Sequence, residues 1–268
     1  MEVHHHTHHP KRWKEYFWEF FMLFMAVFCG FLAEYQLEHK IENDRAKELA
    51  KSMYEELIED SIRLDKIMDL RDKKEECAKY LIKYFKSADF SKEADTALRY
   101  MSFAYISLSS RVIFEPSDGI LNQLQNSGSR RYFKSQDLQN AISKLSTSIG
   151  FIRLRNDREL DYITENLRPF CIEHLNYEWL NELMLDGKLS VTDAFLQNQS
   201  VKNEPPILKN YQSINRDKAM NIAAQLLLML RGMQSATIPE YRKMASTTLH
   251  LLRTEFPELK KVQSAQRN

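Results

Sequence analysis

The sequence predicts an all-α protein in which a transmembrane helix continues into a long juxtamembrane helix, followed by an antiparallel helical bundle. Glycine and proline are scarce, with 6 and 7 among 268 residues, whereas folds rich in turns need many more. Apolar residues recur three and four positions apart over most of the chain, which is the spacing of one helix face. Near the N-terminus, the run from Phe20 to Ala33 contains no charged residue.

The overall composition argues against several classes of protein. The 38 basic residues balance 37 acidic ones, so we expect no nucleic-acid partner. Cys29, Cys77 and Cys171 are far apart in sequence and lack the close pairs of a zinc or redox motif. Cys77 and Cys171 are either two separate buried thiols or, in an oxidising compartment, a disulfide, and the sequence leaves both readings open.

Residues 1–15 are predicted to form a basic, histidine-rich tail. Five imidazoles within six positions could bind Zn²⁺, Ni²⁺ or Cu²⁺. A flexible tail gives these ligands no fixed geometry, so we expect modest affinity. An added purification tag is the alternative, although Thr7 interrupts the histidines. The candidate metal ligands are His4, His5, His6, His8 and His9.

Residues 16–37 are predicted to form the transmembrane helix. Glu19 is the only charged residue between Tyr16 and Ala33, and roughly 20 apolar residues suffice to cross about 30 Å of hydrocarbon. Apolar residues occupy every face, unlike those of a soluble amphipathic helix. A cleaved signal peptide is the main alternative, but "FLAEYQLEH" lacks small residues at alternate positions, which favours an uncleaved signal anchor. The candidate membrane-interface residues are Trp13, Tyr16, Trp18 and Tyr35.

The basic residues nearest this segment predict its orientation. Lys11, Arg12 and Lys14 crowd its N-terminal side, whereas Lys40 and Arg45 are the nearest basic residues beyond it. The positive-inside rule therefore favours a cytoplasmic N-terminus. We expect a single-pass protein of the inner (cytoplasmic) membrane with a periplasmic C-terminal domain.

No sequence signal stops the helix where it would leave the membrane, because no proline or glycine occurs between Gly30 and Pro116. We expect one helix from about Tyr16 to Asp72, about 85 Å long, with much of it projecting as a stalk. Residues 38–72 are its juxtamembrane part, and "RDKKEE" after it marks either a charged break or a solvated face. Residues 73–258 are then the helical extramembrane domain and 259–268 a flexible tail.

The first half of the extramembrane domain contains amphipathic stretches separated by turn signals. One stretch includes Cys77 and Phe85, and the next includes Ala94 and Leu108, with Ser91 as its expected N-cap. "FEPSDG" predicts a turn before the short helix "GILNQLQ", which Ser117 or Asp118 would start. The predicted structural turn after that helix consists of Ser127, Gly128 and Ser135: glycine tolerates a left-handed helix stop, and Ser135 caps the next helix.

The second half begins with a long helix whose apolar stripe runs from Leu138 to Leu167, until Pro169 kinks or ends it. A shorter helix then closes at Asp186-Gly187. Residues 187–210 lack periodicity and predict a long loop. Two helices finish the chain, and "TIPE" at 237–240 predicts a capping box that starts the second.

The order of these elements resembles an uncharacterised family of single-pass membrane proteins of Gram-negative bacteria. The resemblance rests on "LNQLQNSGSRRYFKSQDLQNAISKL", a helix followed by Ser-Gly, a short link and a second helix, and on the final helix "PEYRKMASTTLHLLRTEF". It implies an N-terminal anchor, a long juxtamembrane helix and an all-helical extramembrane domain. The histidine-rich start and the aromatic anchor depart from the family pattern. The family has no known activity, so the resemblance implies no site residues.

These features favour a membrane-anchored scaffold, sensor or interaction module of the bacterial envelope. Its expected partners are the lipid bilayer and either another protein or a second copy of the chain. A cytoplasm-facing regulatory protein is the alternative, with "PKRWK" and "SRRYFK" as local basic clusters. An enzyme is disfavoured because no zinc-protease, nucleophile-elbow or phosphate-loop motif is present. We predict no catalytic residue, cofactor or small-molecule substrate, since Glu173 and His174 are neighbours that do not share a helix face.

Overall fold

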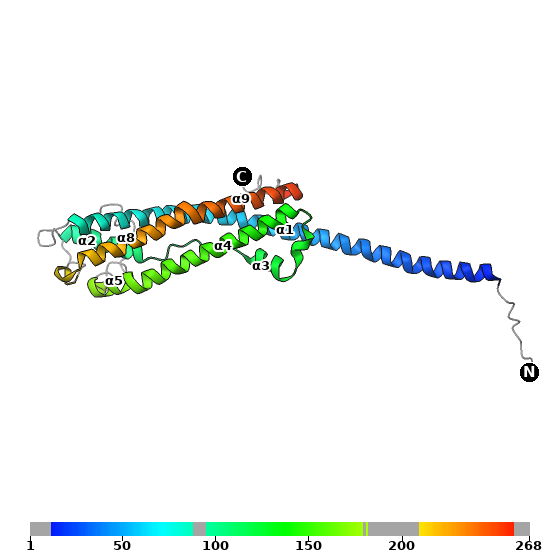
Figure 1. The fold of residues 1–268 in the computed structure, drawn as a ribbon, viewed down its shortest axis with the longest axis horizontal. Coiled ribbons are helices and arrows are strands. Elements are labelled where there is room, and N and C mark those ends of the chain that lie inside the picture. The colour runs from blue at the N-terminus through cyan, green and yellow to red at the C-terminus, as the bar shows by residue number, and fades with distance from the viewer. Residues whose placement is uncertain (1–11, 88–94, 179–180, 182–208, 260–268) are drawn as a thin grey trace, which may run out of the picture.

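The longest helix is α1 (Trp13–Ser87), which runs the length of the bundle and projects beyond it (Figure 1). The computed structural model describes residues 12–87, 95–178, 181 and 209–259. Helix α1 continues 15 residues past the predicted end at Asp72, so "RDKKEE" is no break. From Ala46 onward one face of α1 is packed in the bundle. The segment 38–72, predicted to be juxtamembrane, thus projects only as far as Arg45, and the remainder packs in the bundle.

Ten further elements complete the described part of the bundle. They are α2 (Asp95–Ser109), α3 (Gly119–Asn126), η1 (Ser129–Tyr132), α4 (Gln136–Tyr162), η2 (Ile163–Leu167), α5 (Arg168–His174), η3 (Tyr211–Ser213), α8 (Arg216–Gly232), η4 (Met233–Thr237) and α9 (Ile238–Glu255). Six of them form two long rods, α4–η2–α5 and α8–η4–α9. No β-strand occurs among the described residues. The all-α prediction is therefore confirmed for the part of the chain that the structure describes.

The described helices form an antiparallel bundle (Figure 1). Helix α1 enters from the N-terminal end and runs to the far end. The rod α4–η2–α5 runs the same way, and the rod α8–η4–α9 returns. Helix α2, the non-helical segment 110–118 (the connecting segment) and α3 together fill the fourth position. We call the end near the projecting part of α1 the base of the bundle.

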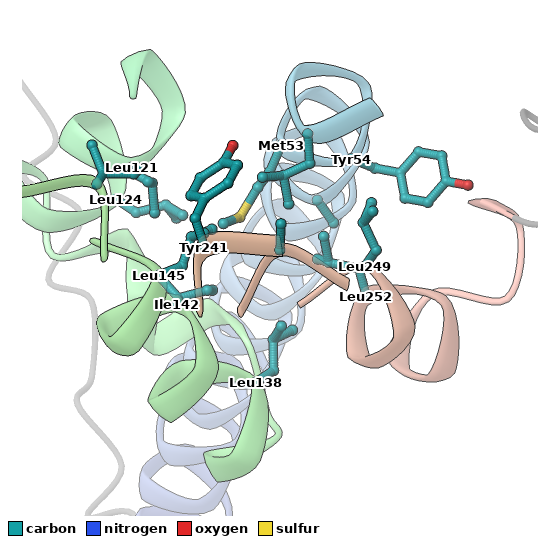
Figure 2. Packing of buried hydrophobic residues seen from close by; sticks show 14 of the residues in the cluster. Met53, Tyr54, Leu121, Leu124, Leu138, Ile142, Leu145, Tyr241, Leu249 and Leu252 are labelled. Atoms are coloured by element: carbon teal, nitrogen blue, oxygen red, sulfur yellow. The ribbon is translucent and has the colours of Figure 1, made fainter. Parts of the chain in front are cut away.

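Apolar side chains gather in two clusters along the bundle. The basal cluster joins α1, α3, α4 and α9, and Figure 2 shows Met53, Ile142 and Leu252 meeting between these helices. The distal cluster joins the end of α1 to α2, α5 and α8, and includes Tyr105 stacked on Phe170 with ring centroids 4.6 Å apart. Burying these apolar surfaces stabilises each end of the bundle.

Both long rods, α4–η2–α5 and α8–η4–α9, contain a π-helical turn, and each turn bears on one sequence prediction. Of the two outcomes predicted for Pro169, an end of the helix is wrong, because η2 joins α4 directly to α5, and a kink stays a prediction. The predicted capping box at 237–240 is wrong: Thr237 has helical dihedral angles and its side chain caps nothing, because η4 continues α8 into α9. Ser91 and most of the predicted loop 187–210 lie outside the described residues.

Candidate functional site

Residues 13–45 of α1 project from the bundle, and they contain the predicted transmembrane segment. Every residue from Arg12 to Arg45 is exposed except the half-buried Glu42. None of the most apolar 18-residue window is buried against the described part of the chain. In a soluble protein such a window would pack in the core, so its exposure and composition make α1 a candidate membrane-spanning helix.

The four candidate interface residues lie at the two ends of this apolar run. Trp13 is 85% exposed, and Tyr16, Trp18 and Tyr35 are also exposed. At 1.5 Å per residue, Tyr35 is about 26 Å along the axis from Trp18 and about 33 Å from Trp13. Their spacing therefore matches a hydrocarbon layer about 30 Å thick.

The predicted turn after α3 has the conformation that the sequence implied. Gly128 is left-handed, with φ of +66°. Ser127 ends α3, and its N–H donates to the carbonyl oxygen of Gln123 at 3.0 Å. The hydroxyl of Ser135 accepts a hydrogen bond from the N–H of Leu138 at 3.2 Å, as an N-cap does. We call residues 127–135 the base loop, because they lie at the base beside α1 (Figure 1).

The base loop is attached to the C-terminal end of α9. Phe133 is fully buried, and its ring lies edge-on to that of Phe256 with centroids 5.8 Å apart. The carboxylate of Glu255 accepts hydrogen bonds from the N–H groups of Lys134 and Ser135, at 2.6 and 3.1 Å. These contacts fix the loop backbone, so its basic side chains are displayed from a rigid frame.

A buried ionic layer separates the two apolar clusters, and we call it the polar layer. Its members, Arg71, Lys74 and Glu159, are each 3% exposed or less. Arg71 Nη2 lies 2.7 Å from Glu159 Oε2, and Lys74 Nζ lies 3.4 Å from Glu159 Oε1. Burial lowers the pKa of Lys74, and the negative charge of Glu159 opposes that shift. One carboxylate thus faces two buried cations.

The polar layer also holds the connecting segment. The Lys74 ammonium donates to the carbonyl oxygen of Ser110 at 2.8 Å, and Arg71 Nη1 donates to that of Val112 at 2.9 Å. Farther along, Asn156 donates to the carbonyl oxygen of Phe114 at 2.8 Å. Since this segment has no helix to satisfy its carbonyl groups, buried side chains of α1 and α4 do so instead.

Asp60 makes the corresponding contacts at the basal end of the connecting segment. Although buried, its carboxylate accepts hydrogen bonds from the N–H and the hydroxyl of Ser117, at 2.8 and 2.9 Å. It also accepts one from the Tyr241 hydroxyl at 3.0 Å and pairs with Arg63. Burial, followed by the nearby Asp60 charge, raises the pKa of Tyr241, so the phenol remains a donor.

The sequence analysis missed Arg71 and Lys74 because it treated "RDKKEE" as a break or a solvated face, and it did not single out Asp60 or Glu159. A signal was nevertheless present in the sequence. The buried face of α1 keeps alternating steps of four and three residues, and Asp60, Arg71 and Lys74 fall on it in register with apolar neighbours. A charged residue at a core position of such a repeat indicates a buried partner.

Two further groups of charged side chains among the described residues lie close together. A cavity of about 450 Å³ lies beside the connecting segment, but Arg153 in its wall pairs with Glu115 and Asp118, both at 2.6 Å. Hydrogen bonding to Arg153 lowers the pKa of Asp118. Glu173 is exposed while His174 is buried, and 3.8 Å between Oε1 and Nε2 is too long for a hydrogen bond.

Cys77 and Cys171 are separate buried thiols, which decides between the two readings that the sequence left open. Both lie in the distal cluster. The candidate metal ligands in the tail lie outside the described residues. Within the described ranges, no three or more His, Cys, Asp or Glu side chains are grouped to hold a metal ion.

Comparison with known proteins adds no further constraint. No protein-family model, curated protein or solved structure matches this chain. The assignment of a function therefore depends on the chain's own geometry.

Proposed function

We propose that the chain is a single-pass membrane protein that holds a rigid helical interaction module at the surface of the bacterial inner membrane. The observation that carries this proposal is the exposed apolar part of α1, which continues without a break into the core of the bundle. The aromatic residues at its two ends support a membrane span of ordinary thickness. We propose the cytoplasmic side for the N-terminus and the periplasm for the bundle, as the basic residues before the span favour.

The proposed module binds another envelope protein or a second copy of the chain. Phe151 and Leu154 support this role, because both are exposed on α4, at 59% and 44%. Beside them Ser148, Arg155 and Glu240 help to line a cavity of about 190 Å³ between α4 and the junction of η4 with α9. Apolar side chains with a polar rim are typical of contact surfaces between proteins.

Membrane insertion is tested by carbonate extraction of the full chain. We expect it to remain in the membrane pellet, because roughly 20 apolar residues stay in the bilayer without help from surface charge. A matched variant, Phe24→Arg together with Phe28→Arg, places two charges in the span and should increase extraction. Complete extraction of the unaltered chain would exclude the anchor.

Orientation is tested by fusing a reporter that works only outside the cytoplasm after Asn268. Activity is expected for the unaltered chain, and it should fall when Lys11, Arg12 and Lys14 are all changed to Glu. Activity from a cytoplasmic reporter at the same position would favour the cytoplasm-facing regulatory protein instead.

The contact surface is tested by placing a photo-crosslinking amino acid at position 151 in membranes. The expected result is a discrete adduct whose mass distinguishes a second copy from a different protein. Position 247, exposed on α9, is the matched control and should give little adduct. The same weak labelling at both positions would remove the proposed contact surface.

A further inference from the structure

The base of the bundle contains a cavity of about 640 Å³ between α1 and the base loop. Residues of α1 just beyond the proposed span form one wall, including His39, Lys40 and Glu42. Arg131 and Lys134 of the base loop line the other. This volume is within the range of small-ligand sites, which is roughly 300–1,000 Å³.

The cavity lies at the height of the lipid headgroups if the proposed span ends at Leu37. Glu42 is then about 8 Å beyond the hydrocarbon edge, at 1.5 Å per residue. Arg131 Nη2 lies 4.0 Å from Glu42 Oε1, so the base loop reaches that same level. A headgroup layer extends roughly 5–8 Å from the hydrocarbon on each side.

The charges of the cavity favour an anion. The walls contain three cationic side chains, those of Lys40, Arg131 and Lys134, and one carboxylate, that of Glu42. The Arg131 side chain is 75% exposed, and its 4.0 Å separation from Glu42 is too long for a hydrogen bond. An ion pair this open in water contributes little, so the guanidinium is available to a phosphate oxygen.

The backbone that carries Arg131 and Lys134 is also held in place before any ligand arrives. The left-handed Gly128, the buried Phe133 and the bonds from the backbone to Glu255 fix the loop. The Arg131 guanidinium lies over the Tyr132 ring, 5.4 Å from its centroid. Arrangement in advance reduces the ordering cost of binding.

We propose that this base cavity binds the phosphodiester headgroup of an anionic phospholipid, with Arg131 and Lys134 as its principal contacts. The proposal rests on the proposed membrane anchor, because only that anchor brings the base to the headgroup layer. The ligand is a bilayer lipid, and its headgroup enters beside α1. Its contact would fix the tilt of the bundle above the membrane.

The test uses the full chain in mild detergent, with native mass spectrometry after adding phosphatidylglycerol or phosphatidylcholine of matched acyl chains. We expect the unaltered chain to bind phosphatidylglycerol about tenfold more tightly than phosphatidylcholine, and added salt to reduce that preference. Arg131→Glu with Lys134→Glu should abolish it. Lys144→Glu with Arg158→Glu makes the same charge change on the exposed side of α4 and should retain it.

Several outcomes would overturn the proposal. Equal binding of the two lipids, or an unchanged preference in the Arg131 and Lys134 variant, would show that the cavity does not select anionic headgroups. Displacement of the lipid by inorganic phosphate at a similar concentration would identify free phosphate as the ligand. Arg131→Gln with Lys134→Gln repeats the test with a milder change, and circular dichroism checks that each variant folds. Carbonate extraction is measured separately, so loss of the lipid site and loss of the anchor are distinguishable.

Discussion

Glu159 is the buried carboxylate at the middle of the bundle. Its carboxylate is the negative charge that faces Arg71 and Lys74, and these three side chains lie between two apolar clusters. A buried ion pair adds little net stability compared with apolar residues of similar volume, but removing one partner leaves the other charge uncompensated. We therefore expect the polar layer to fix how α1, α4 and the connecting segment align.

Replacing Glu159 with Gln should destabilise the protein by about 3–5 kcal/mol, because Arg71 and Lys74 would lose their buried counter-charge. Burial lowers the pKa of Lys74, so the unfolded chain binds more protons between that pKa and the ordinary value. Stability should consequently rise with pH across this window, and the loss in the variant should be smaller in the alkaline range.

The measurement is chemical denaturation of the chain in detergent, followed by circular dichroism at several pH values. Asp157→Asn is the control: it removes an exposed carboxylate from the same helix and should change stability by less than about 0.5 kcal/mol. An equal effect of the two substitutions would argue against an essential role for the buried carboxylate.

The left-handed conformation of Gly128 can be tested by substitution. A Cβ built there meets no atom within 4 Å, so we expect the cost of a side chain to come from the backbone conformation. At φ of +66°, Gly128→Val should cost about 1–2 kcal/mol, and Gly128→Asn less, because Asn tolerates the left-handed region. Thermal melts that coincide for the two variants and the unaltered chain would contradict the assigned turn.

The buried thiols should be unreactive until the bundle unfolds. Burial raises the pKa of Cys77 to about 11 and that of Cys171 to about 12. Near pH 8 their thiolate fractions are then only about 10⁻³ and 10⁻⁴, and the thiolate is the nucleophile. N-ethylmaleimide should label neither residue in the folded chain and both after denaturation without a reductant.

Intact-mass and peptide analysis report this labelling. Ser246→Cys supplies an exposed thiol on α9 that should react in the folded state, which controls for reagent access. Protection of Cys77 and Cys171 that persists in the denatured, unreduced chain would instead indicate a disulfide.

At the scale of elements, a π turn precedes each proline of the two long rods. The N–H of Arg168 donates to the carbonyl oxygen of Ile163, and that of Ile238 donates to Met233, both five residues back. Pro169 and Pro239 follow these donors directly. Proline lacks an N–H and clashes with the carbonyl group four residues earlier in a regular helix. The wider turn therefore lets each rod continue through a proline.

Adding a proline to a regular part of the helix should destabilise the protein more than removing the proline that follows the π turn. Lys243→Pro, in the regular part of α9, should cost about 3 kcal/mol, whereas Pro239→Ala should change stability by less than about 1 kcal/mol. Denaturation of both variants in detergent gives the comparison. A gain of several kcal/mol from Pro239→Ala would mean that the turn accommodates the proline poorly.

The presence of the helices and their apolar faces could be predicted from the sequence. The points where one helix ends or continues into the next were harder to predict. Gly128 and Ser135 have local signatures, and both predictions are confirmed. Thr237 has an equally good local signature, yet its capping box does not form, because packing holds η4 in the helix. The partners of the buried charges were not predictable, since Glu159 is 88 residues from Arg71 and only the fold brings them together.

At the scale of the whole molecule, α1 belongs to two environments. Residues 13–45 project from the bundle and contain the exposed apolar run, whereas from Ala46 to Ser87 one face of the helix packs in the bundle (Figure 1). No described element interrupts it between Trp13 and Ser87. A bundle joined in this way cannot pivot about a flexible linker, because bending would break the hydrogen bonds of the helix.

In the proposed membrane-anchored arrangement, the number of residues between the span and the bundle determines which way the bundle faces, because α1 is continuous. Each residue inserted after Asn43 would turn the bundle by about 100° about the helix axis and lift it by 1.5 Å. Seven inserted alanines would restore nearly the original azimuth about 10 Å higher, whereas two would turn the bundle to a different side. With a crosslinker at position 151, contacts with neighbours in the membrane should survive the seven-residue insertion better than the two-residue one. Loss of crosslinking in both variants would mean that height, and not azimuth, controls which neighbours the bundle meets.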